Sequence, residues 1–268
     1  MTQQPQDETS RRIPNVLACD VGNSAVRMAV VAGEEVSDLR TFRVGELDGL
    51  GGELRRLWSQ MPQPKCIVAA SVNPAALKAV EAAAVEALEQ KVLVVGRDIP
   101  LPMDTDLDSP ESVGTDRVCA AVAAFDRLGK ACVVADFGTA VTIDCVSDQG
   151  VFLGGAILPG LKMQADAMHE RTAALPHIQP AEPQNVFGKD TTDAMLNGML
   201  AAVRGALRYL VESYATSLGH WPVVVCTGGD AELATGGMLD GGLVQAIVPD
   251  LTLRGVAMAY YRTLLSQQ

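Results

Sequence analysis

The sequence has few basic and few aromatic residues. Acidic residues outnumber basic ones, 32 to 21, which gives a net charge of −11 and a pI of about 4.7. This charge argues against extended contact with the phosphate backbone of DNA or RNA, although a small phosphorylated ligand needs only a local site. Aromatic residues make up 4% of the 268 residues. Ala, Val and Leu must therefore build the core, which suits helices packed on sheets.

Signals for metal sites, disulfides and membrane segments are also missing. None of the six cysteines belongs to a Cys-x-x-Cys pair, and the three histidines have no metal-ligand spacing. No apolar stretch approaches the roughly 20 residues that span a bilayer. Most cysteines lie within apolar runs, so we expect buried, reduced thiols. The sequence therefore predicts a cytoplasmic protein without a membrane or nucleic-acid partner.

The sequence does contain the pattern of a globular α/β protein. Hydrophobic residues make up 48% and charged residues 20% of the chain, which excludes disorder for most of it. Residues 1–14 are polar and are expected to form a disordered tail. Beyond them, strand and helix patterns alternate, which favours sheets covered by helices. Strands are predicted at 16–19, 25–32, 36–44, 66–70, 91–95, 131–135, 141–146, 151–158 and 222–226, and helices at 46–60, 75–90, 116–128, 161–171, 191–218 and 252–265.

One motif occurs twice, near the N-terminus and near the middle of the chain. The first copy reads VLACDVGNSAVRMAVV and the second reads VVADFGTAVTIDCV. Each has an apolar strand, an aspartate, a glycine two residues later, small polar residues and a second strand. The two aspartates are Asp20 and Asp136. Two such units predict two related domains, 15–129 and 130–268, that face each other across a cleft.

The turn in each copy has the chemistry of a phosphate-binding site. Glycine lets the backbone approach a ligand closely, and backbone N–H groups together with Asn or Thr side chains can bind phosphate oxygens. An aspartate at the strand end can hold a cation, through water in the case of Mg²⁺. Two opposed turns would hold a polyphosphate from both sides. The alternative for each copy alone is an ordinary hairpin turn.

A second candidate group, Gly114–Arg117, stands before a predicted helix. Asp116 can accept a proton from a substrate hydroxyl. Arg117 can bind a carboxylate or stabilise charge on a phosphoryl group in transfer. The alternative for Asp116 is helix capping, because an acidic residue in the first turn is favoured by the helix dipole.

Three further segments have both a structural and a functional interpretation. Thr227–Asp230 follows a predicted strand, and its glycine pair permits close approach of a ligand, or else it is a turn in which Asp230 caps a helix. Thr191 could cap the long helix that it begins, or present its hydroxyl to a ligand. The glycines around 154–160 are consistent with either a fold requirement or a site.

Taken together, these segments resemble the type III pantothenate kinases, which belong to the superfamily of acetate kinase, sugar kinases, Hsp70 and actin. The segments are DVGNSAVR from Asp20, GTDR from Gly114, DFGTA from Asp136, FLGGAILPGL from Phe152, GKDT from Gly188 and TGGD from Thr227. They occur in order over roughly residues 16–265. The resemblance implies two ribonuclease H-like domains that face a nucleotide cleft. It also implies ATP-dependent phosphorylation of pantothenate to 4′-phosphopantothenate, the first step of coenzyme A biosynthesis, with Mg²⁺, a monovalent cation (K⁺ or NH₄⁺) and a homodimer.

The same resemblance implies roles for individual residues. Those implied for ATP are Asp20, Val21, Gly22, Asn23, Ser24, Ala25, Val26 and Arg27 of the first motif and Thr139 of the second. Those implied for pantothenate are Gly114, Thr115, Asp116, Arg117 and Thr191, the last from near the dimer interface. Asp116 would be the general base, and Asp136 would hold the monovalent cation. One departure is Leu107, which stands where family members often carry Tyr.

Two other functions remain open at this point. The first is a non-catalytic paralogue that binds ATP and acts as a regulator. The presence of Asp20, Asp116, Arg117 and Asp136 argues against it. The second is a kinase of the same superfamily that acts on another small hydroxylated substrate, which Leu107 leaves open.

Overall fold

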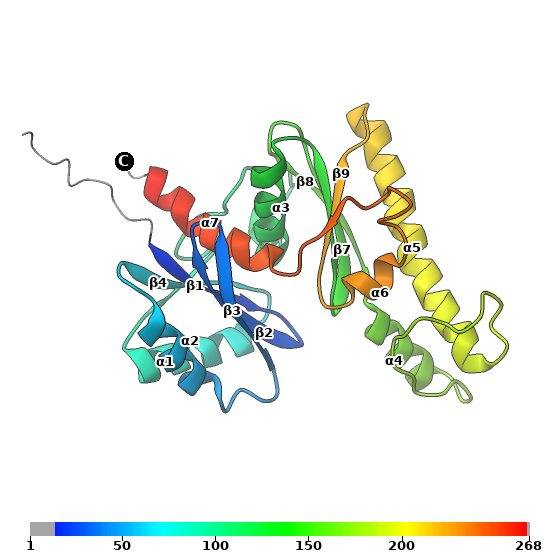
Figure 1. Cartoon of the computed structure of the whole chain (residues 1–268), viewed down its shortest axis with the longest axis horizontal. Coiled ribbons are helices and arrows are strands. Elements are labelled where there is room, and N and C mark those ends of the chain that lie inside the picture. Colours follow the sequence, from blue (N-terminus) through cyan, green and yellow to red (C-terminus); the bar gives the residue numbers. More distant parts are fainter. Residues whose placement is uncertain (1–13, 267–268) are drawn as a thin grey trace, which may run out of the picture.

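The structure is a computed structural model that describes residues 14–266 (Figure 1). All of the predicted tail except Pro14 lies outside the described residues. Within the described range, no helix is both long and apolar enough to cross a membrane. The chain forms two five-stranded sheets with helices on their faces, so the predicted α/β class is confirmed.

The first sheet has the strand order β3-β2-β1-β4-β5. Its strands are β1 (Asn15–Val21), β2 (Ala25–Ala32), β3 (Glu35–Arg43), β4 (Lys65–Ser71) and β5 (Val92–Val94). The strand β1 runs antiparallel to β2 and parallel to β4. Buried residues follow one another almost without interruption along β1, because both faces of the sheet are covered there, which explains why this strand reads as an apolar run.

The second sheet has the order β8-β7-β6-β9-β10, which repeats the first sheet strand for strand. Its strands are β6 (Cys132–Phe137), β7 (Ala140–Val146), β8 (Phe152–Pro159), β9 (Val223–Thr227) and β10 (Ala246–Ile247). Here β6 runs antiparallel to β7 and parallel to β9. The internal repeat seen in the sequence therefore corresponds to two copies of one sheet topology. The exact division of the chain near Gly129 stays a prediction.

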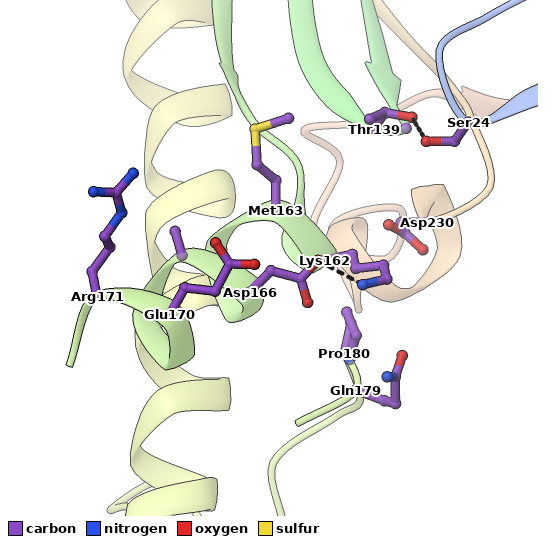
Figure 2. Close-up of a pocket in the computed structure, with 12 residues that line it drawn as sticks. Ser24, Thr139, Lys162, Met163, Asp166, Glu170, Arg171, Gln179, Pro180 and Asp230 are labelled. Atoms are coloured by element: carbon purple, nitrogen blue, oxygen red, sulfur yellow. Dashed lines mark hydrogen bonds and ion pairs between the residues drawn. The ribbon is translucent and has the colours of Figure 1, made fainter. Parts of the chain in front are cut away.

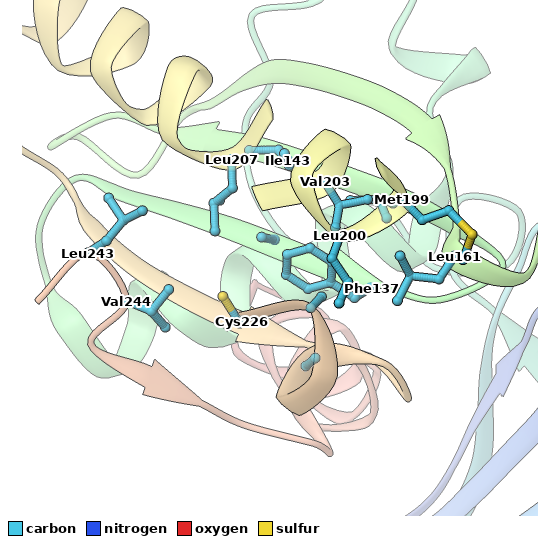
Figure 3. Packing of buried hydrophobic residues seen from close by; sticks show 14 of the residues in the cluster. Phe137, Ile143, Leu161, Met199, Leu200, Val203, Leu207, Cys226, Leu243 and Val244 are labelled. Atoms are coloured by element: carbon cyan, nitrogen blue, oxygen red, sulfur yellow. The ribbon is translucent and has the colours of Figure 1, made fainter. Parts of the chain in front are cut away.

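Each sheet has one face covered by helices from its own half of the chain. In the first half these are α1 (Leu50–Gln60) and α2 (Pro74–Leu88), and in the second α4 (Leu161–Arg171), α5 (Thr191–Leu218) and the short α6 (Ala231–Thr235). Figure 3 shows Leu200, Val203 and Leu207 of α5 packed near Phe137 and Ile143 of the second sheet. These packed side chains fix the sheet that carries the second motif.

The other face of each sheet is covered by a helix from the opposite half. The helix α3 (Thr115–Leu128) follows the first sheet in the chain but packs on the second, through residues such as Val118 and Val122. The helix α7 (Leu251–Ser266) follows the second sheet but packs on the first, through Leu253 and Val256. The two helices lie side by side between the sheets (Figure 1). This exchange brings the start of α3 to the space between the two motifs.

Three features differ from the sequence prediction. The helix predicted from residue 46 begins only at Leu50, because Glu46 is part of a turn in which its N–H donates to Arg43 O and because Gly49 stands at the N-cap. The short elements α6 and β10 were not predicted, and a 3₁₀ turn, η1 (Pro110–Ser112), interrupts the segment before α3. Such short elements lack a full period of apolar residues, so the pattern gives no signal for them.

Candidate active site

The two motifs form equivalent β-hairpins. In the first, Gly22 N–H donates to Ala25 O at 2.9 Å, and in the second Gly138 N–H donates to Ala140 O at 3.1 Å. Asp20 and Asp136 occupy the ends of β1 and β6, the central strands of the two sheets. Both aspartates therefore lie on a strand that is paired with a neighbour on each side.

The tips of the hairpins meet. The Thr139 hydroxyl of the second hairpin donates a 2.7 Å hydrogen bond to the Ser24 hydroxyl of the first. Figure 2 shows both side chains at the rim of a pocket of about 700 Å³. The pocket is lined by Ser24, Gly138, Thr139, Lys162, Met163, Asp166, Ala167, Glu170, Arg171, Gln179, Pro180 and Asp230. The hairpins thus face each other as predicted, and the pocket lies between their tips and α4.

Two turns, one containing Gly160 and the other Gly228, pack closely against the second hairpin. A Cβ at Gly160 would collide with the carbonyl oxygens of Gly138 and Thr139, and a Cβ at Gly228 would collide with Asp136 Oδ1 and Phe137 O. Gly228 also has a φ of +96°, which other residues rarely adopt. The glycines that the sequence left open are therefore required for close packing at the site.

Asp230 stands at the N-cap of α6 but makes no capping hydrogen bond through its side chain. Its backbone N–H donates to Phe137 O at 3.0 Å, and its side chain lines the pocket (Figure 2). The side chain of Asp230 therefore does not cap the helix, and that prediction is wrong. The short helix α6 begins instead with a backbone hydrogen bond, from Ala234 N–H to Asp230 O. The carboxylate faces the pocket instead.

The first turn of α3 positions Asp116. A Cβ at Gly114 would lie 2.6 Å from Asp116 Oδ1, so only glycine leaves that carboxylate its space. Asp116 Oδ1 accepts the N–H of Arg117 at 2.8 Å, while Gly114, not Asp116, is the N-cap. The Thr115 hydroxyl accepts Ser71 N–H at 3.1 Å and so ties α3 to the end of β4. The turn is thus fixed to the first sheet.

Burial and neighbouring acidic charges raise the pKa of Asp20, Asp116 and Asp136. Burial, together with the charges of Asp116 and Asp136, raises the pKa of Asp20 to about 7. Burial and the charge of Asp116 raise the pKa of Asp136 to about 6, and burial raises the pKa of Asp116. The charge of Arg27 lowers the first two pKa values but does not offset the rise. The raised pKa values mean that the ionised carboxylates are unfavourable so close together and away from water. A bound cation would stabilise them.

Arg117 pairs with Asp144, a residue of β7 that is not among the predicted site residues. Arg117 Nε donates to both carboxylate oxygens at 3.1 Å, and Nη2 donates to Oδ1. Asp144 is only 1% exposed. A signal was present, because an aspartate between the buried Ile143 and Cys145 interrupts an apolar strand, and a buried charge needs a partner.

The region around Asp136 also fits a cation. The hydroxyl of Thr227 is buried and has no hydrogen-bond partner among the described residues. Thr227 is the β9 residue paired with Asp136 of β6, so the two side chains lie on the same face of the sheet. Within residues 14–266, no group of three or more His, Cys, Asp or Glu is arranged to hold a metal ion by itself. A cation here would need oxygens from a substrate or water as well.

A family model for type III pantothenate kinase matches residues 16–213. The chain belongs to the type III pantothenate kinases. It is 31% identical over 254 residues to the type III pantothenate kinase of Moorella thermoacetica, covering 92% of this chain and 99% of that one. It is 32% identical over 255 residues to that of Dehalococcoides mccartyi, covering 91% and 96%. The family identified from the sequence motifs is therefore confirmed.

Solved structures with the same fold are more distant in sequence. A Baf family protein from Campylobacter jejuni has a TM-score of 0.56 and 20% identity, covering 93% of this chain and 99% of that chain. MreB5 of Spiroplasma citri bound to ADP has a TM-score of 0.51 and 12% identity, covering 96% and 100%. These similarities confirm the predicted actin-like fold of this type III pantothenate kinase.

The remaining residues that the resemblance implied lie in different environments. The side chains of Val21 and Val26 are buried in the core against α1 and α2, so only their backbone faces the turn. Arg27 donates to Pro249 O at 2.6 Å, which ties the first hairpin to the start of α7. Asn23 is exposed at the hairpin tip and Ala25 is partly buried beside it. Their roles in binding ATP stay predictions.

Thr191 lies apart from the other candidate residues. It is the exposed first residue of α5. The start of this helix lies at the end of the molecule away from α3 (Figure 1). The helix is capped by Asp190, whose side chain accepts Asp193 N–H at 2.8 Å, so the capping interpretation of Thr191 is wrong. Gly188 packs closely there, since a Cβ would lie 2.5 Å from Ala194 Cα.

Proposed function

We propose that this type III pantothenate kinase transfers the γ-phosphoryl group of ATP to the primary hydroxyl of pantothenate, the first step of coenzyme A biosynthesis. The observation that carries the proposal is the convergence of Asp116 on Asp20 and Asp136. These three carboxylates come from a helix and from both phosphate-type hairpins. Family membership identifies pantothenate as the acceptor.

The pocket, the hairpin tips and the first turn of α3 can each be assigned to one part of the two substrates. The pocket beside α4 has the volume for the nucleoside of ATP. The backbone N–H groups and hydroxyls at the hairpin tips, including Ser24 and Thr139, would bind its phosphates. The γ-phosphate would then point toward Asp20 and Asp136, and pantothenate would bind beyond it, against Asp116 and Arg117.

Asp116 is the general base in this proposal. Its raised pKa makes the carboxylate a better proton acceptor than an ordinary aspartate. It would take the proton of the pantothenate hydroxyl as that oxygen attacks the γ-phosphorus, while the bond to the β,γ-bridging oxygen breaks and ADP leaves. The hairpins and the first turn of α3 hold the reacting groups in line, and positioning is the larger part of catalysis in phosphoryl transfer.

The proposal includes Mg²⁺ and a monovalent cation. Asp136, beside the partnerless Thr227 hydroxyl, would hold the monovalent ion, and Asp20 would hold Mg²⁺ through water. When bound, the cations would neutralise charge on the phosphates. The raised pKa values of both aspartates support this assignment, since a nearby positive charge would relieve the repulsion between them.

We also propose a homodimer in the cytoplasm. Several large apolar side chains of the second half are exposed, among them Ile157 of the edge strand β8 and Phe187, which are 64% and 75% exposed. Burial of such residues drives association. A second copy could also bring its Thr191 to the acceptor site. All six cysteines are free, which supports a reducing compartment.

The test is release of ADP by the purified protein with ATP, Mg²⁺ and pantothenate, with K⁺ compared against Na⁺. We expect turnover that requires pantothenate and increases with K⁺, with 4′-phosphopantothenate identified as the product. Turnover with another hydroxylated acceptor but not pantothenate would favour the second superfamily kinase. ATP binding without turnover on any acceptor would favour the regulatory paralogue. Light scattering on the same sample would decide the dimer.

A further inference from the structure

The ion pair between Arg117 and Asp144 joins the start of α3 to the middle of β7. The Nε and Nη2 side of the guanidinium faces both oxygens of the carboxylate. The side chains are 16% and 2% exposed, so the pair is largely withdrawn from water. A charge pair in such a position is costly unless its geometry is fixed by several hydrogen bonds. This pair has them.

The surroundings of the pair are shaped to hold it. The guanidinium lies over the ring of Phe152, with the carbon Cζ 5.7 Å from the ring centre. Gly155 is the β8 residue opposite Asp144, and a Cβ there would collide with Asp144 Oδ1 and with Ile143 O. The neighbouring strand therefore leaves open the space that the Asp144 carboxylate occupies. Asp144 therefore fixes one edge of the Arg117 guanidinium, and the ring of Phe152 packs against one of its faces.

One edge of Arg117 remains available. A guanidinium has five N–H donors, and Asp144 occupies the Nε–H and one of the Nη2–H groups. Within residues 14–266, Nη1 has no hydrogen-bond acceptor. The Nη1 and Nη2 nitrogens on that edge have the spacing that binds a carboxylate through two parallel hydrogen bonds.

The two arginines near the acidic cluster, Arg27 and Arg117, interact with different aspartates. Arg27 is the cation whose charge acts on Asp20 and Asp136, at the ends of the hairpins. The charge of Arg117 acts on Asp116 and Asp144. Arg27 belongs to β2 of the first hairpin, which would bind the phosphates, and Arg117 follows Asp116 in the first turn of α3, where the acceptor would bind.

We propose that Asp144 is a positioning residue, which holds the guanidinium of Arg117 so that its free edge binds the carboxylate of the acceptor. This rests on the proposed function, because pantothenate supplies that carboxylate. Asp144 has no direct contact with the substrate in this proposal. Without it, the guanidinium would lose its fixed direction and turn toward the nearby carboxylates, and the binding edge would be lost.

The main test is Asp144→Asn, with Asp148→Asn as the matched control. Asp148 is also paired, with His220 at 2.7 Å, but that pair is exposed and lies at the far end of the second sheet. For Asp144→Asn we expect KM for pantothenate to rise about 10-fold or more, the equivalent of one strong hydrogen bond. We expect kcat to change less than about 3-fold and KM for ATP to stay the same. Asp148→Asn should change none of these.

A second comparison tests recognition of the carboxylate itself. In pantothenyl alcohol a hydroxyl group replaces the carboxylate, and its primary acceptor hydroxyl is unchanged. The preference of the wild-type enzyme for pantothenate over this alcohol, measured as kcat/KM, should fall about 10-fold in Asp144→Asn. Arg117→Lys should lose the same preference, and the double variant should lose no more than either single one.

A readout independent of activity is the NMR signal of the Arg117 Nε–H group. The buried pair should protect it from exchange in the wild type, and Asp144→Asn should remove that protection. If Asp144→Asn does not fold, Phe152→Leu keeps both charges but removes the ring under the guanidinium, and should raise KM for pantothenate by a smaller factor.

Two results with an active enzyme would overturn the proposal. One is loss of Nε–H protection with an unchanged KM and unchanged preference for the acid. The other is a fall in kcat at unchanged KM, which would place Arg117 on the transferring phosphoryl group. If the wild type does not phosphorylate pantothenate at all, the proposed function fails. A shift of the Arg117 signals with propionate, in the wild type but not in Asp144→Asn, would still support the positioning role, and its absence would refute it.

Discussion

The hydroxyls of Ser24 and Thr139 are joined by a 2.7 Å hydrogen bond, although they lie 115 residues apart in the chain. Each is at the tip of one copy of the repeated hairpin, and both line the pocket. The bond is the direct polar link between the two phosphate-type turns. It places both hydroxyls together at the pocket, where they could bind the phosphates of ATP.

Replacement of Ser24 by Ala should therefore weaken ATP binding more than it weakens the fold. Loss of one exposed hydrogen bond should lower the free energy of unfolding by no more than about 1 kcal/mol. The same loss at the phosphate site should raise KM for ATP by about 3- to 10-fold, with KM for pantothenate unchanged. Steady-state kinetics at varied ATP will measure this. Ser59→Ala, which changes an exposed serine of α1, is the control.

Asp116→Asn tests the general base. Turnover should fall by about 10²- to 10⁴-fold, because the amide cannot accept the proton of the hydroxyl. The protein should remain folded, since burial raises the pKa of Asp116 and its ionised form is a cost in the ligand-free state. Asp126→Asn, an exposed position on the same helix, should retain normal turnover. A nearly unchanged kcat for Asp116→Asn would show that another group takes the proton.

The raised pKa values of Asp20 and Asp136 predict a pH dependence of stability. Between pH 4 and pH 7 the folded protein binds more protons at these sites than the unfolded chain does. The contribution of the two groups to the free energy of unfolding therefore decreases as pH rises through this range, without nucleotide or divalent cation present. Asp136→Asn should stabilise the ligand-free protein at pH 7 by about 1–3 kcal/mol and have little effect at pH 4.

Urea unfolding at pH 4, 5.5 and 7 would measure this difference. Asp148→Asn is a control of opposite sign, because the Ala131 N–H group and His220 lower the pKa of Asp148. That variant should lose stability at pH 7 relative to the wild type. An Asp136→Asn protein that is less stable than the wild type at pH 7 would contradict the electrostatic description of the cluster.

The two adjacent glycines of the Thr227–Asp230 turn should respond differently to Ala. Gly228 has a φ of +96° and has Phe137 O and Asp136 Oδ1 where a Cβ would go, whereas Gly229 has open space there. Gly228→Ala should lower the free energy of unfolding by more than about 2 kcal/mol and lower activity, because the backbone cannot move aside. Gly229→Ala should stay within about 1 kcal/mol of the wild type. Equal effects of the two changes, measured by thermal unfolding, would refute this assignment.

A similar comparison tests the contact between α3 and α7. A Cβ at Gly255 of α7 would collide with Cys119 O on α3, while Gly205 on α5 has nothing near the same position. Gly255→Ala should force the helices apart and cost about 1–3 kcal/mol. Gly205→Ala should be stabilising by about 0.5–1 kcal/mol, since alanine favours a helix. Chemical unfolding would measure the free energy of unfolding of both variants. A Gly255→Ala protein as stable as the wild type would show that α3 and α7 are not tightly packed at this contact.

Much of the fold could be predicted because its signals are local. The apolar run that ends at Asp20 and the one that ends at Asp136 mark β1 and β6, and the repeated turn marks two hairpins of one kind. The motif order also identified the family, which the comparisons confirmed. The start of α1 was misplaced because its apolar spacing continues into the turn before Gly49, where glycine, not periodicity, decides.

The sequence alone determined the two hairpins, the alternation of strands and helices and the family of the chain, because each depends on residues close together along it. Only the tertiary structure decided which side chains meet. The packing of α3 on the second sheet brings Asp116 to Asp136 and Arg117 to Asp144. Asp144 on its own is a polar residue in an apolar strand. Its partner lies 27 residues away, on a helix whose place between the sheets follows from the packing of both halves.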